Sequence, residues 1–358
     1  MYALGQLTVA MCSMLLFLII DPSFYQVAIS SALFFTALGF WLILGDSSTE
    51  KKWRWIEITA GSLCMALAVG CRANHMFFLL LIPVVLLGEL KELWNDRKRF
   101  IGFCACVAVP CTLVVCSLLW YNYIRFGSVF ETGNYYVLGG NSVKAGRLMN
   151  PLGRLTGILI GCISCLIPSF HISASFPFIS LQIIEKNLAF KTASFNITPM
   201  MGLMSLPVTW FVFNIGTVKK TIDKQREPIL YLIVAMICLG FLQIVATLYL
   251  VDGIVYRYAP DFFWLFILSG LFCAYYIYER LVEYQRQTTQ IQSFITLNLS
   301  EMIERIIFIA MVLSISLSFL ITLSGKPEFF GGGTWNTIFI SNPSVFYSLQ
   351  RLLGFNTW

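Results

Sequence analysis

The chain has 358 residues and a formal net charge of +6; 58% of its residues are hydrophobic and only 12% are charged. A soluble domain carries about 25% charged residues, so this chain lacks the polar surface that water requires. The composition excludes a soluble enzyme, a disordered scaffold and a nucleic-acid-binding protein, and it predicts an all-α polytopic membrane protein.

Nine apolar runs without charged residues predict about nine transmembrane helices. A helix needs about 20 apolar residues to cross a bilayer. In chain order the runs are Tyr2–Ile20, Phe24–Gly45, Ile58–Gly70, His75–Gly88, Ile101–Tyr121, Met201–Val218, Ile229–Val251, Phe262–Tyr278 and Ile306–Ser324.

The third and fourth runs are short. Thirteen or fourteen residues reach only about 20 Å, whereas the hydrocarbon core is about 30 Å thick. The turn 71–74 between them is therefore expected below the outer membrane surface. An arginine at that depth, Arg72, must face protein or a wet cavity rather than lipid.

The orientation follows from the lysines and arginines. Fourteen of the 24 lie in four loops, within residues 51–54, 91–99, 219–226 and 280–305. The positive-inside rule places these loops in the cytoplasm. We therefore expect a cytoplasmic N-terminus and a C-terminus outside the cell.

Residues 155–184 carry no formal charge and invite assignment as a tenth span. One crossing there would move the Lys219–Arg226 loop outside, against the positive-inside rule. Pro168 and Pro177 also break the stretch. We therefore expect interfacial or re-entrant helices on the outer face, which gives transmembrane helices 1–5 in residues 1–121, a large outer-face loop in 122–200, helices 6–9 in 201–324 and an outer tail in 325–358.

Arg72 and His75 are the first residues that predict chemistry. The guanidinium of Arg72 offers a planar set of donors suited to phosphate, although an arginine there also suits helix capping or snorkelling to the interface. His75 follows one turn later. A lone histidine serves either as a structural hydrogen-bonding group or as a supporting site residue, and both readings stay open.

The predicted outer turn 256–262 contains Arg257, Tyr258 and Asp261. Arg257 and Asp261 are four residues apart, so on an α-helix they would share a face and pair. Alternatively, Arg257 binds a phosphate that Asp261 helps to orient. Tyr258 is either an interfacial aromatic residue or part of the same site.

Two further positions lie at the outer ends of predicted spans. Asp21 follows the first span and is either a general base or part of an Asp-Pro turn that ends the helix. Arg125 and Glu131 open the long outer loop, as interface anchors or as acceptor-binding residues.

The sequence predicts no metal site and no resident cofactor, although a divalent metal requirement stays open. The eleven cysteines lie in apolar runs, and the Cys162–Cys165 pair has no second pair to complete a zinc site. P-loop, GxGxxG, HExxH and GxSxG motifs are absent from the sequence.

Four segments resemble bacterial C-type (GT-C) membrane glycosyltransferases. Leu63–Asn74 (LCMALAVGCRAN) is similar to their GLAVGSRPN turn, and Tyr121–Glu131 (YNYIRFGSVFE) to their YNYxRFGSPFE loop entry. Phe176–Ile179 (FPFI) matches their FPFI stretch, and Tyr256–Phe262 (YRYAPDF) resembles their RYxxDF turn. The matches occur in the same order and cover most of residues 55–265.

The resemblance implies sugar transfer from a polyprenyl-phosphate donor to an envelope glycan or lipid acceptor at the outer face of the bacterial inner membrane. It implies that Arg72 and Arg257 bind the donor phosphate in a shared pocket and that a carboxylate in the first outer loop is the base. In the relatives that carboxylate lies several spans upstream of the turn matched by Leu63–Asn74, whereas only two spans precede it here. Either Asp21 takes the role or the chain is an N-terminally truncated member, which we expect because Met1–Ile20 has no basic flank.

Two other functions remain open at this point. A lipid-carrier flippase or transporter would show repeated broken helices near the membrane centre. A non-catalytic membrane partner in polysaccharide assembly would lack the catalytic carboxylate.

Overall fold

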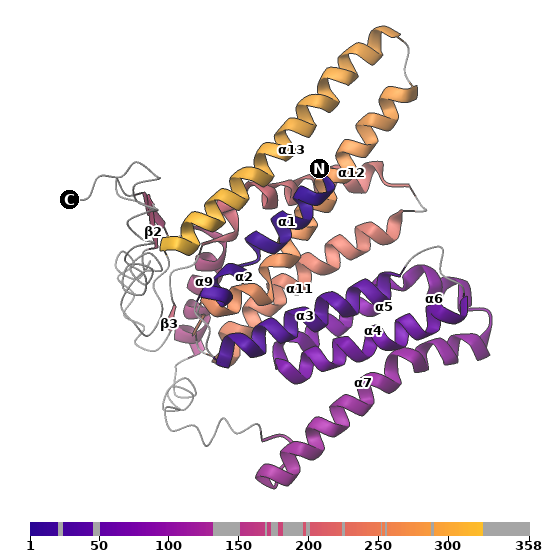
Figure 1. Cartoon of the computed structure of the whole chain (residues 1–358), viewed down its shortest axis with the longest axis vertical. Helices are drawn as coiled ribbons and strands as arrows, with labels where there is room; N and C mark the ends of the chain where they lie inside the picture. Colours follow the sequence, from indigo (N-terminus) through magenta and orange to yellow (C-terminus); the bar gives the residue numbers. More distant parts are fainter. Residues whose placement is uncertain are drawn as a thin grey trace, which may run out of the picture. The chain divides into compact units, whose positions relative to one another are not determined.

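The computed structural model describes residues 1–20, 24–45, 51–131, 151–168, 170–172, 178–181, 196–197, 201–223, 226–251, 253–254, 256–287 and 290–324. The chain forms two compact units (Figure 1). Unit 1 comprises Met1–Pro22, Leu155–Thr221 and Gly253–Trp358, and unit 2 comprises Ser23–Arg154 and Ile222–Asp252.

Six helices in the described ranges are long and apolar enough to cross a membrane. They are α3 (Phe24–Leu44), α4 (Lys51–Cys71), α7 (Arg97–Phe126), α11 (Glu227–Val251), α12 (Phe263–Gln287) and α13 (Gln290–Ser324). The chain is thus a helical protein with the multi-pass character that its composition predicts.

The other three predicted runs form broken helices. Residues 2–20 form α1 (Tyr2–Cys12) and α2 (Leu15–Ile20), separated where Met14 adopts a φ of 64°. Residues 73–93 form the 3₁₀ helix η1 (Ala73–Leu80), then α5 (Leu81–Val85) and α6 (Leu87–Leu93). Residues 203–221 form η4 (Leu203–Ser205), η5 (Pro207–Asn214) and α10 (Ile215–Thr221). A 3₁₀ helix rises about 2.0 Å per residue, so these segments cover more distance than α-helices of equal length.

In unit 2, α3 and α4 pack side by side through glycines (Figure 1). A Cβ atom added to Gly61 would lie 2.9 Å from the Gly39 carbonyl oxygen and 2.7 Å from Cγ1 of Ile43. Real side chains do not fit at such distances, so the two backbones approach each other because both positions lack a side chain. Small residues at helix contacts are typical of membrane proteins.

Arg54 stabilises the end of this helix pair that the sequence predicts to be cytoplasmic. Its guanidinium donates hydrogen bonds to the backbone oxygens of Leu42 (3.3 Å) and Ile43 (2.6 Å), near the end of α3. Its Nε donates to Oε1 of Glu89 on α6 at 3.0 Å. Carbonyls at a helix end have no partner within the helix, so Arg54 caps α3 and links three helices.

α4 is longer than the sequence predicted. The expected span Ile58–Gly70 is wrong in length, because the helix starts at Lys51 and has 21 residues. At 1.5 Å per residue it reaches about 30 Å. Helix length by itself therefore does not require the turn at Arg72 to lie below the membrane surface.

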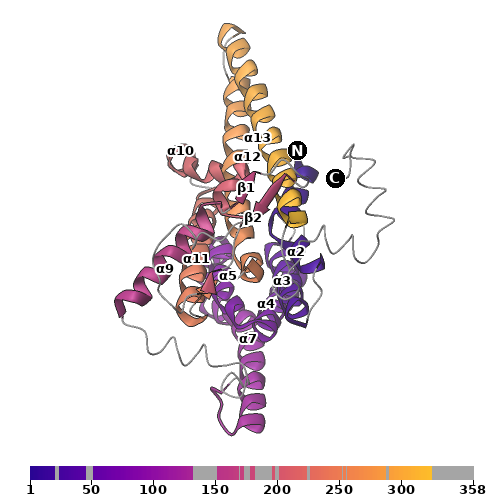
Figure 2. The same ribbon diagram turned by 90° about the vertical axis from the view of Figure 1, so that its left-hand side faces the viewer.

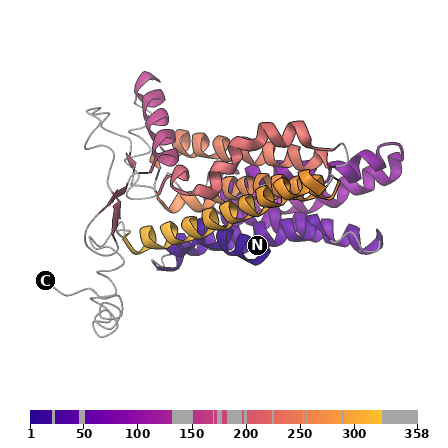
Figure 3. The ribbon, with the colours of Figure 1, turned by 90° about the horizontal axis from the view of Figure 1, so that it is seen from above.

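In unit 1, α12 and α13 run side by side with α1 packed against both (Figures 1, 2 and 3). The hydroxyl of Tyr275 donates to the backbone oxygen of Met1 at 3.0 Å, and Ser318 donates to that of Met11 at 2.8 Å. η5 approaches α12 at Gly270, where any Cβ would overlap the carbonyl oxygen of Val208. Close backbone contacts therefore hold the broken helices of this unit.

Only part of the predicted outer loop 122–200 lies in the described residues. α9 (Pro151–Leu166) ends before Pro168, and its described apolar part, Leu155–Leu166, is too short to cross a membrane alone. β1 (Phe170–Ile172) pairs antiparallel with β2 (Ile179–Leu181), and β3 (Asn196–Ile197) pairs parallel with β4 (Gly253–Ile254).

Candidate functional site

Unit 2 contains a buried group of polar side chains among apolar helices. α3 and α11 both contact η1. The group, called here the polar cluster, consists of Thr36 on α3, Asn74 and His75 on η1, and Gln243 and Thr247 on α11. Polar side chains inside a membrane-spanning unit are costly, so they mark positions where hydrogen bonding serves a purpose.

His75 is held in one orientation. It is 1% exposed, its Nδ1 lies 2.8 Å from Oγ1 of Thr36, and its ring meets Phe78 edge-on at 4.9 Å. The Thr36 hydroxyl donates its single hydrogen to the backbone oxygen of Ala32 at 2.8 Å. Thr36 therefore links Nδ1 of His75 to the backbone of α3.

α11 contributes two members of the cluster, and neither was singled out from the sequence. Gln243 and Thr247 are one turn apart and are 0% and 1% exposed. Nδ2 of Asn74 donates to Oγ1 of Thr247 at 3.5 Å, and Nε2 of Gln243 donates to the Asn74 backbone oxygen at 3.4 Å. Both bonds are long. In the described part of the chain, Oε1 of Gln243 is buried without a hydrogen-bond partner.

That amide oxygen is the most informative atom of the cluster. An unsatisfied buried acceptor costs about 1–3 kcal/mol. Such groups are rare in native proteins and call for an explanation such as a bound donor. The sequence does contain a signal for Gln243 and Thr247, because they are two polar residues spaced i, i+4 inside an otherwise apolar run. A mean hydropathy value does not detect this spacing.

Arg72 lies where α4 ends and η1 begins. Its backbone is extended (φ −154°, ψ 115°), its N–H donates to the Ala68 oxygen at 2.9 Å, and its carbonyl accepts the His75 N–H at 3.0 Å. The residue is partly exposed, while Nη2 of its guanidinium is buried. The backbone of Arg72 therefore connects the last turn of α4 to the first turn of η1, on which Asn74 and His75 lie.

The second predicted phosphate-binding turn lies in unit 1, in η6 (Tyr256–Asp261). The Arg257 guanidinium lies 5.7 Å from the centre of the Tyr258 ring, and Asp261 is completely buried. A 3₁₀ helix has three residues per turn, so residues four apart do not share a face. The turn is thus a 3₁₀ helix rather than the α-helix considered for the pairing of Arg257 with Asp261, and that pairing stays a prediction.

The remaining predicted residues are placed as follows. Arg125, at the end of α7, donates to the Tyr121 hydroxyl at 3.1 Å and lies over the Phe126 ring. Glu131 is the last residue described before the gap, and Asp21 lies outside the described residues. Binding of one phosphate by both Arg72 and Arg257 stays a prediction.

The described ranges contain no group of three or more histidine, cysteine or acidic side chains placed to hold a metal ion. Burial raises the pKa values of the Cys162 and Cys165 thiols on α9. Because the thiolate is the form that binds metal, this environment disfavours the pair as a metal site.

Comparison of the chain with known protein families, with curated proteins and with solved structures finds no match. Its function is therefore inferred from its own residues.

Proposed function

We propose that the chain is a membrane glycosyltransferase, or a part of one, that transfers a sugar from a polyprenyl-phosphate donor. The acceptor is an envelope glycan or lipid at the outer face of a bacterial inner membrane. The observation that carries the proposal is the helix break at Arg72, whose carbonyl oxygen accepts the backbone N–H of His75 in the polar cluster. The resemblance of Leu63–Asn74 to a glycosyltransferase turn supports the same assignment.

The proposed topology has nine spans. The six long helices cross the membrane, and the broken segments 2–20, 73–88 and 201–218 supply the other three crossings. This arrangement puts the N-terminus in the cytoplasm and the C-terminal tail outside, in keeping with the positive-inside rule. Arg72 and Arg257 then both lie toward the outer face.

In the proposed reaction, a carboxylate removes the proton of an acceptor hydroxyl, and that oxygen attacks the anomeric carbon of the donor. The bond between this carbon and the phosphate oxygen breaks, and polyprenyl phosphate leaves. Arg72 and Arg257 stabilise the charge that develops on the phosphate, a contribution of about 3–4 kcal/mol per well-placed donor in other enzymes. Asp21 is the proposed base in this chain.

The supporting residues position substrate. His75 bonds Thr36 through Nδ1 and donates its backbone N–H to the Arg72 carbonyl, and in this way it positions Arg72 and η1 against α3. Tyr258 supports Arg257 and Asp261 helps to orient the phosphate, while Arg125 and Glu131 border the acceptor side. No resident cofactor is part of the proposal.

Product analysis tests the proposal. The purified protein is incubated with a panel of polyprenyl-phosphate-linked hexoses and pentoses in the presence of envelope lipids and glycans. Release of polyprenyl phosphate together with a glycosylated acceptor is expected. Absence of release with every donor, from a protein that still binds polyprenyl phosphate, would favour a non-catalytic partner.

A lipid-carrier transporter is the second candidate, and one feature favours it. Each unit contains an eight-residue 3₁₀ segment inside an apolar run, η1 in unit 2 and η5 in unit 1. Broken helices in both halves are typical of transporters. A transporter would move the intact polyprenyl-phosphate sugar across vesicle membranes without consuming it, whereas a transferase would cleave it.

A further inference from the structure

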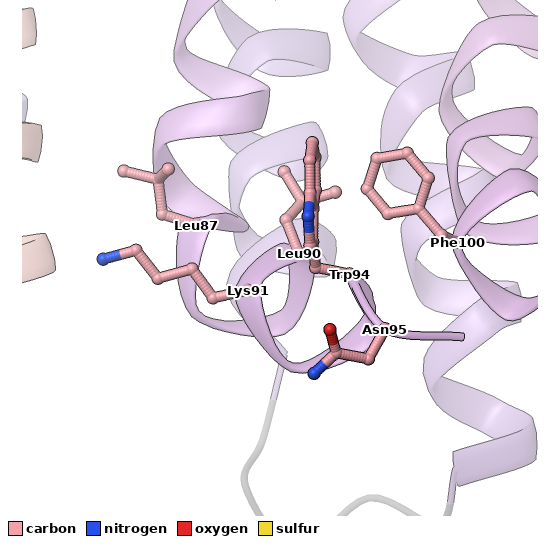
Figure 4. A pocket seen from close by; sticks show the side chains of 6 residues that line it. All are labelled: Leu87, Leu90, Lys91, Trp94, Asn95 and Phe100. Atoms are coloured by element: carbon pink, nitrogen blue, oxygen red, sulfur yellow. The ribbon is translucent and has the colours of Figure 1, made fainter. Parts of the chain in front are cut away.

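A pocket of about 430 Å³ lies at the turn between α6 and α7, within unit 2 (Figure 4). Four of its lining side chains are apolar or aromatic and two are polar: Leu87, Leu90, Trp94 and Phe100, with Lys91 and Asn95. Figure 4 shows the Trp94 and Phe100 side chains next to each other, and Lys91 beside Leu87. The Trp94 and Phe100 rings meet edge-on, 5.3 Å apart, so the apolar wall is continuous.

The pocket lies where an apolar helix meets a basic turn. α7 is a candidate membrane span that begins at Arg97, and Ile101, one turn further, is 66% exposed. Trp94 is 71% exposed. Exposed tryptophan beside cationic residues is typical of the boundary between lipid tails and headgroups. The pocket therefore faces both acyl chains and headgroups.

The side chains around the pocket carry a net positive charge. Glu89 is bound to Arg54, and Asp96 pairs with Arg99 at 3.4 Å. Among the described residues, Lys91, Arg97 and Lys98 form no ion pair and are exposed. The single uncompensated carboxylate in this segment is Glu92. Two positive charges are thus left for a partner.

We propose that this pocket binds an anionic phospholipid of the surrounding membrane. The acyl chain packs against Leu87, Leu90 and the Trp94–Phe100 pair, and the ammonium group of Lys91 binds the headgroup phosphate. The Asn95 amide donates to the same headgroup. Basic pockets at helix ends on a membrane surface suit anionic lipids, whose charge adds to the apolar burial. This site is independent of the proposed sugar transfer.

Quenching by brominated lipids tests the site, because Trp94 reports contact locally. The protein and the Trp94→Phe variant are reconstituted in vesicles of dibromo-phosphatidylglycerol or dibromo-phosphatidylcholine, mixed with the unbrominated lipids. The chain has nine tryptophans, so the difference between the two proteins isolates Trp94. Phenylalanine preserves the ring contact with Phe100.

We expect Trp94 to be quenched with about a fivefold preference for phosphatidylglycerol, the factor expected for one lysine near an anionic surface. Lys91→Gln should remove most of this preference. Lys220→Gln, on α10 of the other unit, is the matched control and should leave it unchanged.

Four results would overturn the proposal. These are equal quenching by the two lipids, a preference that survives Lys91→Gln, an equal loss with Lys220→Gln, or no quenching of Trp94 by either lipid. The last result would mean that something other than lipid covers the pocket.

Discussion

Replacing Gln243 by methionine should make the protein more stable and less active. Gln243 is completely buried on α11, and its Oε1 has no partner in the described residues. Methionine has a similar length and a flexible, apolar side chain, so it can fill the same space without an unsatisfied oxygen. A residue kept for binding, rather than for folding, should respond in this way.

The expected magnitude follows from two opposing terms. Removing the unsatisfied acceptor should gain about 1–3 kcal/mol. Losing the long bond from Nε2 to the Asn74 backbone oxygen, at 3.4 Å, should cost about 0.5 kcal/mol. The free energy of unfolding should therefore rise by about 0.5–2.5 kcal/mol.

Unfolding in mixed micelles, titrated with sodium dodecyl sulfate and followed by tryptophan fluorescence, measures the change. Leu242→Met, at an exposed neighbouring position, is the control and should change stability by less than about 0.5 kcal/mol. A loss of stability in Gln243→Met would refute the reasoning, because it would show that the amide is satisfied. Unchanged activity would separately refute its role in binding.

Two further predictions use the same unfolding assay. Gly270→Ala should lose about 3 kcal/mol or more, because its methyl group would overlap the Val208 carbonyl; Gly216→Ala, with open space around its Cβ, should be neutral or gain up to about 1 kcal/mol. Equal stability of the two variants would show that η5 does not contact α12 there. Arg54→Met should cost about 1–3 kcal/mol because the α3 carbonyls and Glu89 lose their donor, and recovery of full stability by Arg54→Lys would contradict the role of the planar guanidinium.

Hydropathy predicted the long spans because the membrane demands apolar side chains over a fixed length. The run Phe24–Gly45 corresponds to α3 (Phe24–Leu44), and Ile229–Val251 to α11 (Glu227–Val251). It did not predict how far helices continue past the apolar region. α13 starts at Gln290 rather than at Ile306, and the Glu301–Arg305 ion pair one turn apart (3.8 Å) lies in the added part.

The broken helices could not be predicted from the same signal. An apolar run predicts which part of the chain lies in the membrane, but it does not predict whether the backbone there forms α or 3₁₀ hydrogen bonds. The 3₁₀ segment η5, for example, lies in close contact with α12, where the Val208 backbone approaches Gly270. Such contacts are set by residues far apart in the sequence.

The candidate site was predicted in part. Arg72 and His75 were found because ionisable residues are rare in apolar runs. Gln243 and Thr247 were missed because neutral polar residues barely lower the hydropathy of a span, and their importance appears only once α11 lies against Asn74. Asp21 and most of the loop 122–200 remain predictions.

The central claim is that Arg72 binds the phosphate of a polyprenyl-phosphate carrier, and binding of polyprenyl phosphate itself tests it most directly. This measurement needs no catalytic base, so it applies equally to an enzyme and to a fragment. Arg72→Ala should weaken binding at least about tenfold, the loss expected for one charge-assisted hydrogen bond, while the control Arg305→Ala, at an exposed arginine of α13, should bind normally. Equal affinity of Arg72→Ala and the unaltered protein would contradict the claim.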